Sequence, residues 1–67
     1  MFYVFMNFLS GRTILVKEKG FYRFVHESLM AGREPVFFEN RKAAVSLMKR
    51  TFPESMHSGR VIIAPWQ

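Results

Sequence analysis

The apolar residues of this chain repeat at two different spacings, and the longer spacing identifies one helix. From Arg41 to Phe52 they recur every three or four positions, which places them on one side of an α-helix with Lys, Ser and Arg on the other. Asn40 precedes this pattern, and its side-chain oxygen can accept a free N–H of the first turn. Pro53 disfavours helical geometry in the residue before it, so we expect the helix to end there.

Short apolar runs rich in aromatic and β-branched residues predict strands on either side of this helix. The run that leads into the helix follows Pro35, which suits the first residue of a strand because it has no N–H to donate. Two glycine-containing turns separate the earlier runs and favour hairpins. The predicted strands are residues 2–9, 13–17, 36–38 and 60–64, with turns at 10–12 and 18–20, a polar connection at 54–59 and a C-terminal tail at 66–67.

Residues 21–30 fit more than one structure. As a strand, the segment alternates Phe21, Arg23 and Val25 against its other side chains. As a helix, its apolar residues form a stripe that ends at Leu29. A strand that becomes helical near His26 also fits, and the sequence leaves these three alternatives open.

Together these elements predict an α+β fold in a single small domain, residues 1–67. We expect an antiparallel or mixed sheet of three to five strands with one long amphipathic helix packed on one face, in the order β-β-(β or α)-β-α-β. Both faces of the 2–9 strand are apolar, so either the 21–30 segment or another molecule must cover its second face.

The amino-acid composition limits which partners, metals and cofactors the chain can bind. Ten Lys and Arg residues against five Glu give a net charge of +5, which favours an acidic partner. There is no cysteine, so disulfides and thiolate zinc sites are excluded, and we expect no metal and no cofactor. No segment reaches the ~20 apolar residues of a membrane span, so we expect a cytoplasmic protein without membrane contact. A core this small favours association, including a homodimer.

Two basic groups are candidate binding sites. Helix N-termini attract anions, so cations placed there suit a phosphate or a partner's carboxylate, and a row of cations along the helix can follow a polyanion. The helix group is Asn40, Arg41, Lys42, Ser46, Lys49 and Arg50. A second group lies along the predicted hairpin among aromatic residues, an arrangement that suits single-stranded nucleic acid. Its members are Arg12, Lys17, Lys19 and Arg23.

A third candidate is a hydrophobic interface made by Tyr3, Phe5, Leu9 and Trp66, because exposed apolar surface marks partner sites and an edge strand can pair with its own copy. His26, beside Glu27, and His57, beside Ser58, are the candidates for acid–base or nucleophilic chemistry, and the sequence does not show whether the two histidines meet. The leading interpretation is a non-enzymatic binding or regulatory protein, an inhibitor or accessory factor of the phage or mobile-element type, that docks on an acidic protein. A nucleic-acid-binding regulator using the same helix is the alternative, and a small ribonuclease-type toxin is third.

Overall fold

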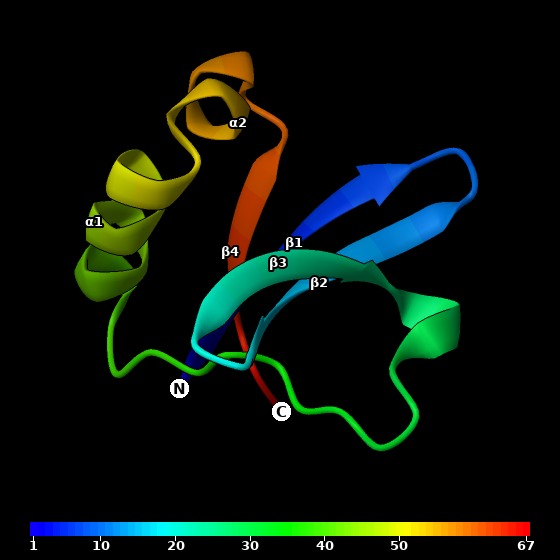
Figure 1. Ribbon diagram of the computed structural model, residues 1–67. Coiled ribbons are helices and arrows are strands. Elements are labelled where there is room, and N and C mark those ends of the chain that lie inside the picture. Colours follow the sequence, from blue (N-terminus) through cyan, green and yellow to red (C-terminus); the bar gives the residue numbers. More distant parts are fainter.

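A four-stranded antiparallel sheet carries a helical layer on one face in the structure, a computed structural model that describes all residues 1–67 (Figure 1). The expected α+β class, with one long helix packed on a small antiparallel sheet, is confirmed. The strands lie in the spatial order β3-β2-β1-β4. The elements are β1 (Phe2–Phe8), β2 (Gly11–Glu18), β3 (Phe21–His26), a 3₁₀ turn η1 (Glu27–Leu29), α1 (Arg41–Thr51), α2 (Pro53–Ser58) and β4 (Val61–Pro65).

Tight turns join the first three strands into a meander. Lys19 and Gly20 connect β2 to β3 with φ of 52° and 83°, the two positive angles of a type I′ hairpin turn. The β1–β2 connection is shorter than expected, because Phe8 pairs directly with Gly11 and the loop is only Leu9 and Ser10. Each turn therefore closes a strand pair that is adjacent in sequence.

The segment after Gly20 takes the third of the three alternatives open to it. It begins as the edge strand β3 and becomes a 3₁₀ turn directly after His26. His26 itself starts the turn, because its Nδ1 accepts a hydrogen bond from the Ser28 backbone N–H at 3.1 Å. The change of structure thus follows a local side-chain cap.

The long helix α1 forms where the periodicity predicts it. Asn40 is extended, and its Oδ1 accepts from the Ala43 backbone N–H at 2.8 Å, so the predicted N-cap is confirmed. The helix ends at Thr51, with Phe52 as its C-cap. The core joins its inner face to three of the strands and consists of Val4, Leu15, Ile63, Ala44, Leu47 and Met48.

The polar connection expected at 54–59 is wrong, because most of it forms the short helix α2. Pro53 is its first residue, where its fixed φ and missing N–H are tolerated, and Glu54 adds a negative charge to the first turn. Gly59 ends it in a left-handed conformation with φ of 76°. The same proline that ends α1 therefore also begins α2.

The strand expected at 36–38 is also wrong, and the structure shows why. β1 and β2 are paired only from Phe5–Ile14 to Phe8–Gly11, and beyond that they separate. The 36–38 segment fills the gap: Val36 donates its N–H to the Leu15 carbonyl at 2.9 Å, while Phe38 exchanges two backbone bonds of 2.8 Å with Phe2. Divided between two strands, it builds a continuous ladder with neither and forms one isolated bridge.

Candidate functional site

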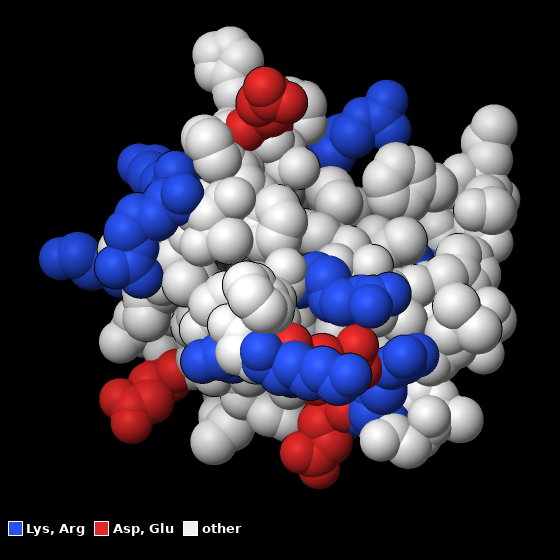
Figure 2. Space-filling view, viewed as in Figure 1, with Lys and Arg blue, Asp and Glu red and all other residues white.

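A row of cationic and polar side chains lies along the outer side of α1. We call Lys42, Ser46, Lys49 and Arg50 the helix row; all four are exposed. The helix contains no acidic residue, and both ion pairs of the protein are formed elsewhere, at Glu18. Figure 2 shows a group of blue atoms over the position of α1, with no red atoms among them. The helix row is therefore an uncompensated positive surface.

The other two residues of the predicted helix group have intramolecular partners. Asn40 caps α1 through its Oδ1. The Arg41 guanidinium folds back over the sheet, where it donates to the Ile63 carbonyl at 2.8 Å and lies 6.0 Å from the Phe2 ring centroid. The structure therefore does not present Asn40 and Arg41 beside Lys42 as a free anion site at the start of the helix.

Part of the second basic group assembles at the end of the β2–β3 hairpin. Glu18 forms ion pairs with Arg23 at 3.6 Å and with Arg33, whose Nε donates to the carboxylate. Phe21 stands beside them and is 75% exposed. We call this arrangement the hairpin cluster; its residues, Glu18, Lys19, Phe21, Arg23 and Arg33, line a hollow of about 590 Å³.

The sequence did not identify Arg33 as a member of this cluster. The residue lies in the loop after η1, fifteen positions from Glu18, and its guanidinium also donates to the Leu29 carbonyl at 2.6 Å. The only local signal for this residue is its spacing of four positions from Leu29, whose carbonyl the Arg33 side chain reaches. Its contact with Glu18 depends on the path of the loop, which no periodic pattern encodes.

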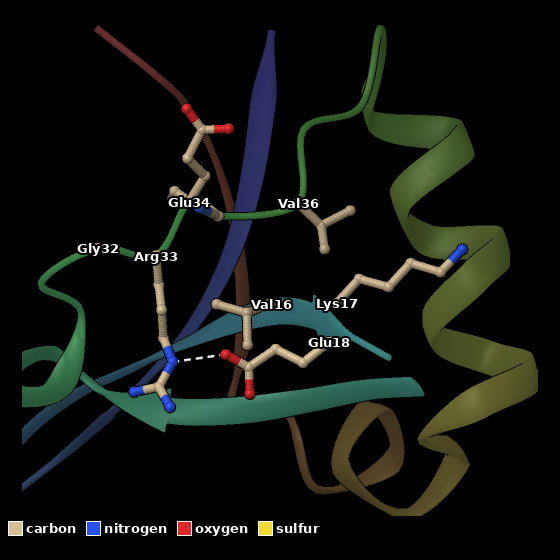
Figure 3. Close-up of a pocket in the computed structure, with 8 residues that line it drawn as sticks. Val16, Lys17, Glu18, Gly32, Arg33, Glu34 and Val36 are labelled. Carbon is tan, nitrogen blue, oxygen red and sulfur yellow. Dashed lines mark hydrogen bonds and ion pairs between the residues drawn. The ribbon is translucent and has the colours of Figure 1, made fainter. Parts of the chain in front are cut away.

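A groove lies between the last part of β2 and the loop that follows η1 (Figure 3). It has a volume of about 770 Å³, and Arg33 crosses it to reach Glu18, as the dashed line shows. Two of its eight lining residues, Val16 and Val36, are hydrophobic. Pockets for small molecules are mostly apolar, so this polar groove does not resemble one.

The remaining members of the second basic group do not join the hairpin cluster. Lys17 places its amine 5.1 Å from the Tyr22 ring centroid. Arg12 lies over the Phe5 ring at 4.0 Å and donates to the Tyr3 hydroxyl at 2.8 Å. Arg12 therefore covers aromatic side chains of the chain itself, whereas Lys17 is exposed beside Tyr22.

The predicted hydrophobic interface is corrected at two of its four residues. Tyr3 and Phe5 are only 8% and 6% exposed, because Arg12 covers both and the Trp66 ring packs edge-on against Tyr3 at 5.0 Å. Phe37 in turn packs against Trp66 at 5.3 Å. The chain covers this face of the sheet with its own C-terminal tail and the 36–38 segment.

Exposed apolar surface persists at the other two members. Leu9 is fully exposed at the tip of the β1–β2 loop, and Trp66 keeps 48% of its surface exposed. The first strand, however, lies between β2 and β4. The sequence had suggested that this strand could pair with a second copy, but its backbone is not a free edge.

The two histidines do not form a common site. His26 bonds to the Ser10 carbonyl and to Ser28 next to η1. His57 is exposed on α2, beside Lys49 and Met56. Figure 1 shows η1 and α2 in separate parts of the molecule. The structure therefore does not bring the two histidines together, and the ribonuclease interpretation, which needs only a histidine beside basic residues, stays a hypothesis.

Three observations complete the description of the surface. Nowhere are three His, Cys, Asp or Glu side chains grouped so that they could hold a metal ion. Neither helix has the length and apolar character needed to cross a bilayer. Comparison with protein-family models, curated proteins and solved structures found no match. Among the exposed charges of the chain, those of the helix row and the hairpin cluster lie in groups.

Proposed function

We propose that this protein is a non-enzymatic binding module that docks on the acidic surface of a partner protein through the helix row. The observation that carries the proposal is the uncompensated charge of α1, whose exposed cations face solvent without any acidic residue in the helix. A surface of one sign attracts a partner of the opposite sign and accelerates its association.

The stability of the helix accounts for only part of this charge. Lys49 and Arg50 lie in the last turn, where positive charge interacts favourably with the helix dipole. Lys42 lies in the first turn, where the same dipole opposes it by about 0.3–1 kcal/mol at low salt. The helix dipole therefore does not account for Lys42, which supports a role in binding for the row.

Nucleic acid is the second candidate, and one observation favours it. The helix row has no aromatic side chain on which a base could stack, but the hairpin cluster exposes Phe21 among Lys19, Arg23 and Arg33. Stacking on an aromatic ring next to cations is the usual way that proteins hold single strands. The salt dependence of binding separates the two candidates.

The test measures fluorescence anisotropy with a labelled polyglutamate peptide and a labelled single-stranded oligonucleotide. Arg50→Glu is expected to weaken polyglutamate binding about fivefold, because it reverses a charge within the row. Arg60→Glu makes the same change of net charge at an exposed cation that lies 5.7 Å from the Phe8 ring, away from α1, and is expected to have little effect.

Equal losses in the Arg50→Glu and Arg60→Glu variants would contradict the proposal, because they would show that only net charge matters. Preference for the oligonucleotide, with affinity falling by a log–log slope of about −0.7 per phosphate contact, would favour the second candidate. Loss of oligonucleotide binding on Phe21→Ala would then locate that site at the hairpin cluster.

A further inference from the structure

The two edges of the sheet are protected to different degrees. At the β4 edge, the Arg41 guanidinium donates to the Ile63 carbonyl at 2.8 Å, and Pro65 has no N–H to offer. Prolines and charged side chains are the devices by which proteins prevent edge strands from pairing with other chains. The β4 edge therefore carries two such devices.

The β3 edge has no proline and no side chain bonded to its backbone, and Arg23 is its one charged residue apart from His26. Its register with β2 is unbroken over six pairs, from Thr13–His26 to Glu18–Phe21, and it contains no proline. The hydrogen bonds of the protein include none from a side chain, a loop or a helix to the backbone of Phe21–Val25. This edge is open along the length of the strand.

The turn geometry identifies which backbone groups face outward. In a two-residue type I′ turn, Glu18 and Phe21 exchange both of their backbone hydrogen bonds. Because bonded and non-bonded pairs alternate along the ladder, the backbone N–H and C=O of Arg23 point toward β2, and those of Tyr22 and Phe24 point outward. The Leu15 carbonyl gives independent support. Leu15 is opposite Phe24, and its carbonyl accepts a hydrogen bond from the Val36 N–H on the far side of β2. Leu15 and Phe24 are therefore a non-bonded pair, as the alternation requires.

The charge around this edge selects the kind of strand that fits it. Arg23 lies on β3 itself with its side chain 60% exposed, and its 3.6 Å contact with Glu18 is a weak surface ion pair. Lys19 stands in the turn at one end of the strand, and Arg33 shares Glu18. An added strand would place alternate side chains beside these cations, so acidic residues fit there.

We propose that β3 binds an extended acidic segment of a partner protein as an added β-strand, with backbone bonds to Tyr22 and Phe24 and carboxylates beside Arg23. The proposal rests on the proposed function only in expecting an acidic partner, because it uses a different surface. A second copy of this chain fits the edge poorly, since each copy carries a net charge of +5 and would bring another Arg23 to the same place.

The test uses a labelled peptide of alternating glutamate and valine as the probe. Tyr22→Pro removes an outward N–H, and Tyr22→Ala is its matched control, because both variants lose the same side chain and only one loses the donor. Proline is tolerated on an edge strand where the N–H faces solvent. We expect the proline variant to bind the peptide about tenfold more weakly than the alanine variant.

Amide hydrogen exchange of the unmodified protein keeps the test independent of any folding defect in the proline variant. In the free protein, the amides of Tyr22 and Phe24 are expected to exchange fast, while those of Arg23 and Val25 are protected. The peptide is expected to protect Tyr22 and Phe24. Equal binding by the two Tyr22 variants, or no added protection of these amides, would overturn the proposal.

Charge reversals and amide protection separate this site from the helix row. Arg23→Glu is expected to weaken binding of the glutamate–valine peptide more than Arg60→Glu, which makes the same change of net charge beside Phe8. Protection of the Tyr22 and Phe24 amides reports on β3 and not on the helix row, so either proposal can fail without the other. An oligonucleotide that binds as tightly as the peptide and does not respond to Tyr22→Pro would make the site purely electrostatic and contradict strand addition. A dimer whose Tyr22 and Phe24 amides are already protected without peptide would assign the edge to a second copy and also contradict it.

Discussion

At the scale of single residues, His26 joins η1 to the β1–β2 loop, which lies sixteen residues earlier in the sequence. Its Nε2 lies 2.9 Å from the Ser10 carbonyl, which can only accept, so Nε2 carries the proton and Nδ1 is left to accept from the Ser28 N–H. The adjoining Glu27 carboxylate accepts the Arg12 backbone N–H at 2.9 Å. The two side chains fasten η1 to the β1–β2 hairpin.

This close approach depends on a residue without a side chain at Gly11. Its φ is 128°, and an added Cβ would lie 2.5 Å from the Glu27 carboxylate oxygen and 3.0 Å from the His26 ring. Glycine is therefore needed at this position for two reasons: it tolerates the positive φ, and it leaves space for the Glu27 and His26 side chains.

His26→Ala is expected to lower the free energy of unfolding by about 1–3 kcal/mol, because it removes the cap of η1 and leaves two bonds unmade. His57→Ala is the matched control, since His57 is exposed and makes no recorded hydrogen bond. Urea unfolding followed by the fluorescence of the single tryptophan measures both. Equal stability of the two variants would show that the His26 bonds contribute nothing.

At the scale of elements, α1 is attached to the sheet by more than its apolar face. Arg41 reaches from the first turn to β4, so one side chain ties the helix start to the edge strand. A charged donor that satisfies a strand-edge carbonyl contributes more than a neutral one. The attachment also explains why the first residue of the helix tolerates a positive charge.

Arg41→Met is expected to lower the free energy of unfolding by about 1.5–3 kcal/mol, because it removes a charged hydrogen bond to Ile63. Lys42→Met removes a positive charge at the next position, where the helix dipole opposes it, and is expected to raise the free energy of unfolding by about 0.3–1 kcal/mol. Thermal unfolding followed by circular dichroism compares the two. A smaller loss for Arg41→Met than for Lys42→Met would contradict this role of Arg41.

Elements defined by local signals could be predicted from the sequence, and elements defined by distant contacts could not. The cap at Asn40 and the helical spacing after it specify α1 within its own residues, and Lys19-Gly20 likewise specifies its turn. The role of 36–38 depends on Phe2 and Leu15, which are far away in sequence. An apolar run can signal a strand, but it does not show that two other strands will separate around it.

The same difference applies to the candidate sites. The helix row could be predicted because one helix holds all its members at fixed spacing. Arg12 and Arg41 are cations by type, yet one covers Tyr3 and Phe5 and the other binds Ile63. Long cationic side chains reach several ångströms from their own backbone, so the sequence did not show which of them would turn inward.

At the scale of the whole molecule, positive charge exceeds negative charge twofold and is poorly paired. Ten Lys and Arg residues face five Glu, and both ion pairs are formed by Glu18. Figure 2 shows the blue atoms in separate groups, one over α1 and another around the β2–β3 hairpin. Repulsion within these groups lowers the stability of the folded state at low salt.

Raising sodium chloride from low to physiological concentration is therefore expected to stabilise the fold by about 0.5 kcal/mol, since the Debye length shortens from roughly 30 Å at 0.01 M to about 8 Å. Lys49→Glu is expected to reduce this gain, because it removes one repelling charge from α1 and adds an attractive one. Thermal melts across a salt series measure both. Destabilisation by salt would contradict net repulsion in the folded protein.

The insertion of 36–38 between β1 and β2 also has a dynamic consequence. Because this segment supplies backbone partners to Phe2 on one side and to Leu15 on the other, its release is expected to remove a partner from two strands in a single step, while β4 still pairs with Phe2 and β3 with Leu15. Phe37 would leave Trp66 in the same step, so indole fluorescence would register it. Local unfolding of the loop before α1 is thus expected to be coupled to fraying of the β1 N-terminus.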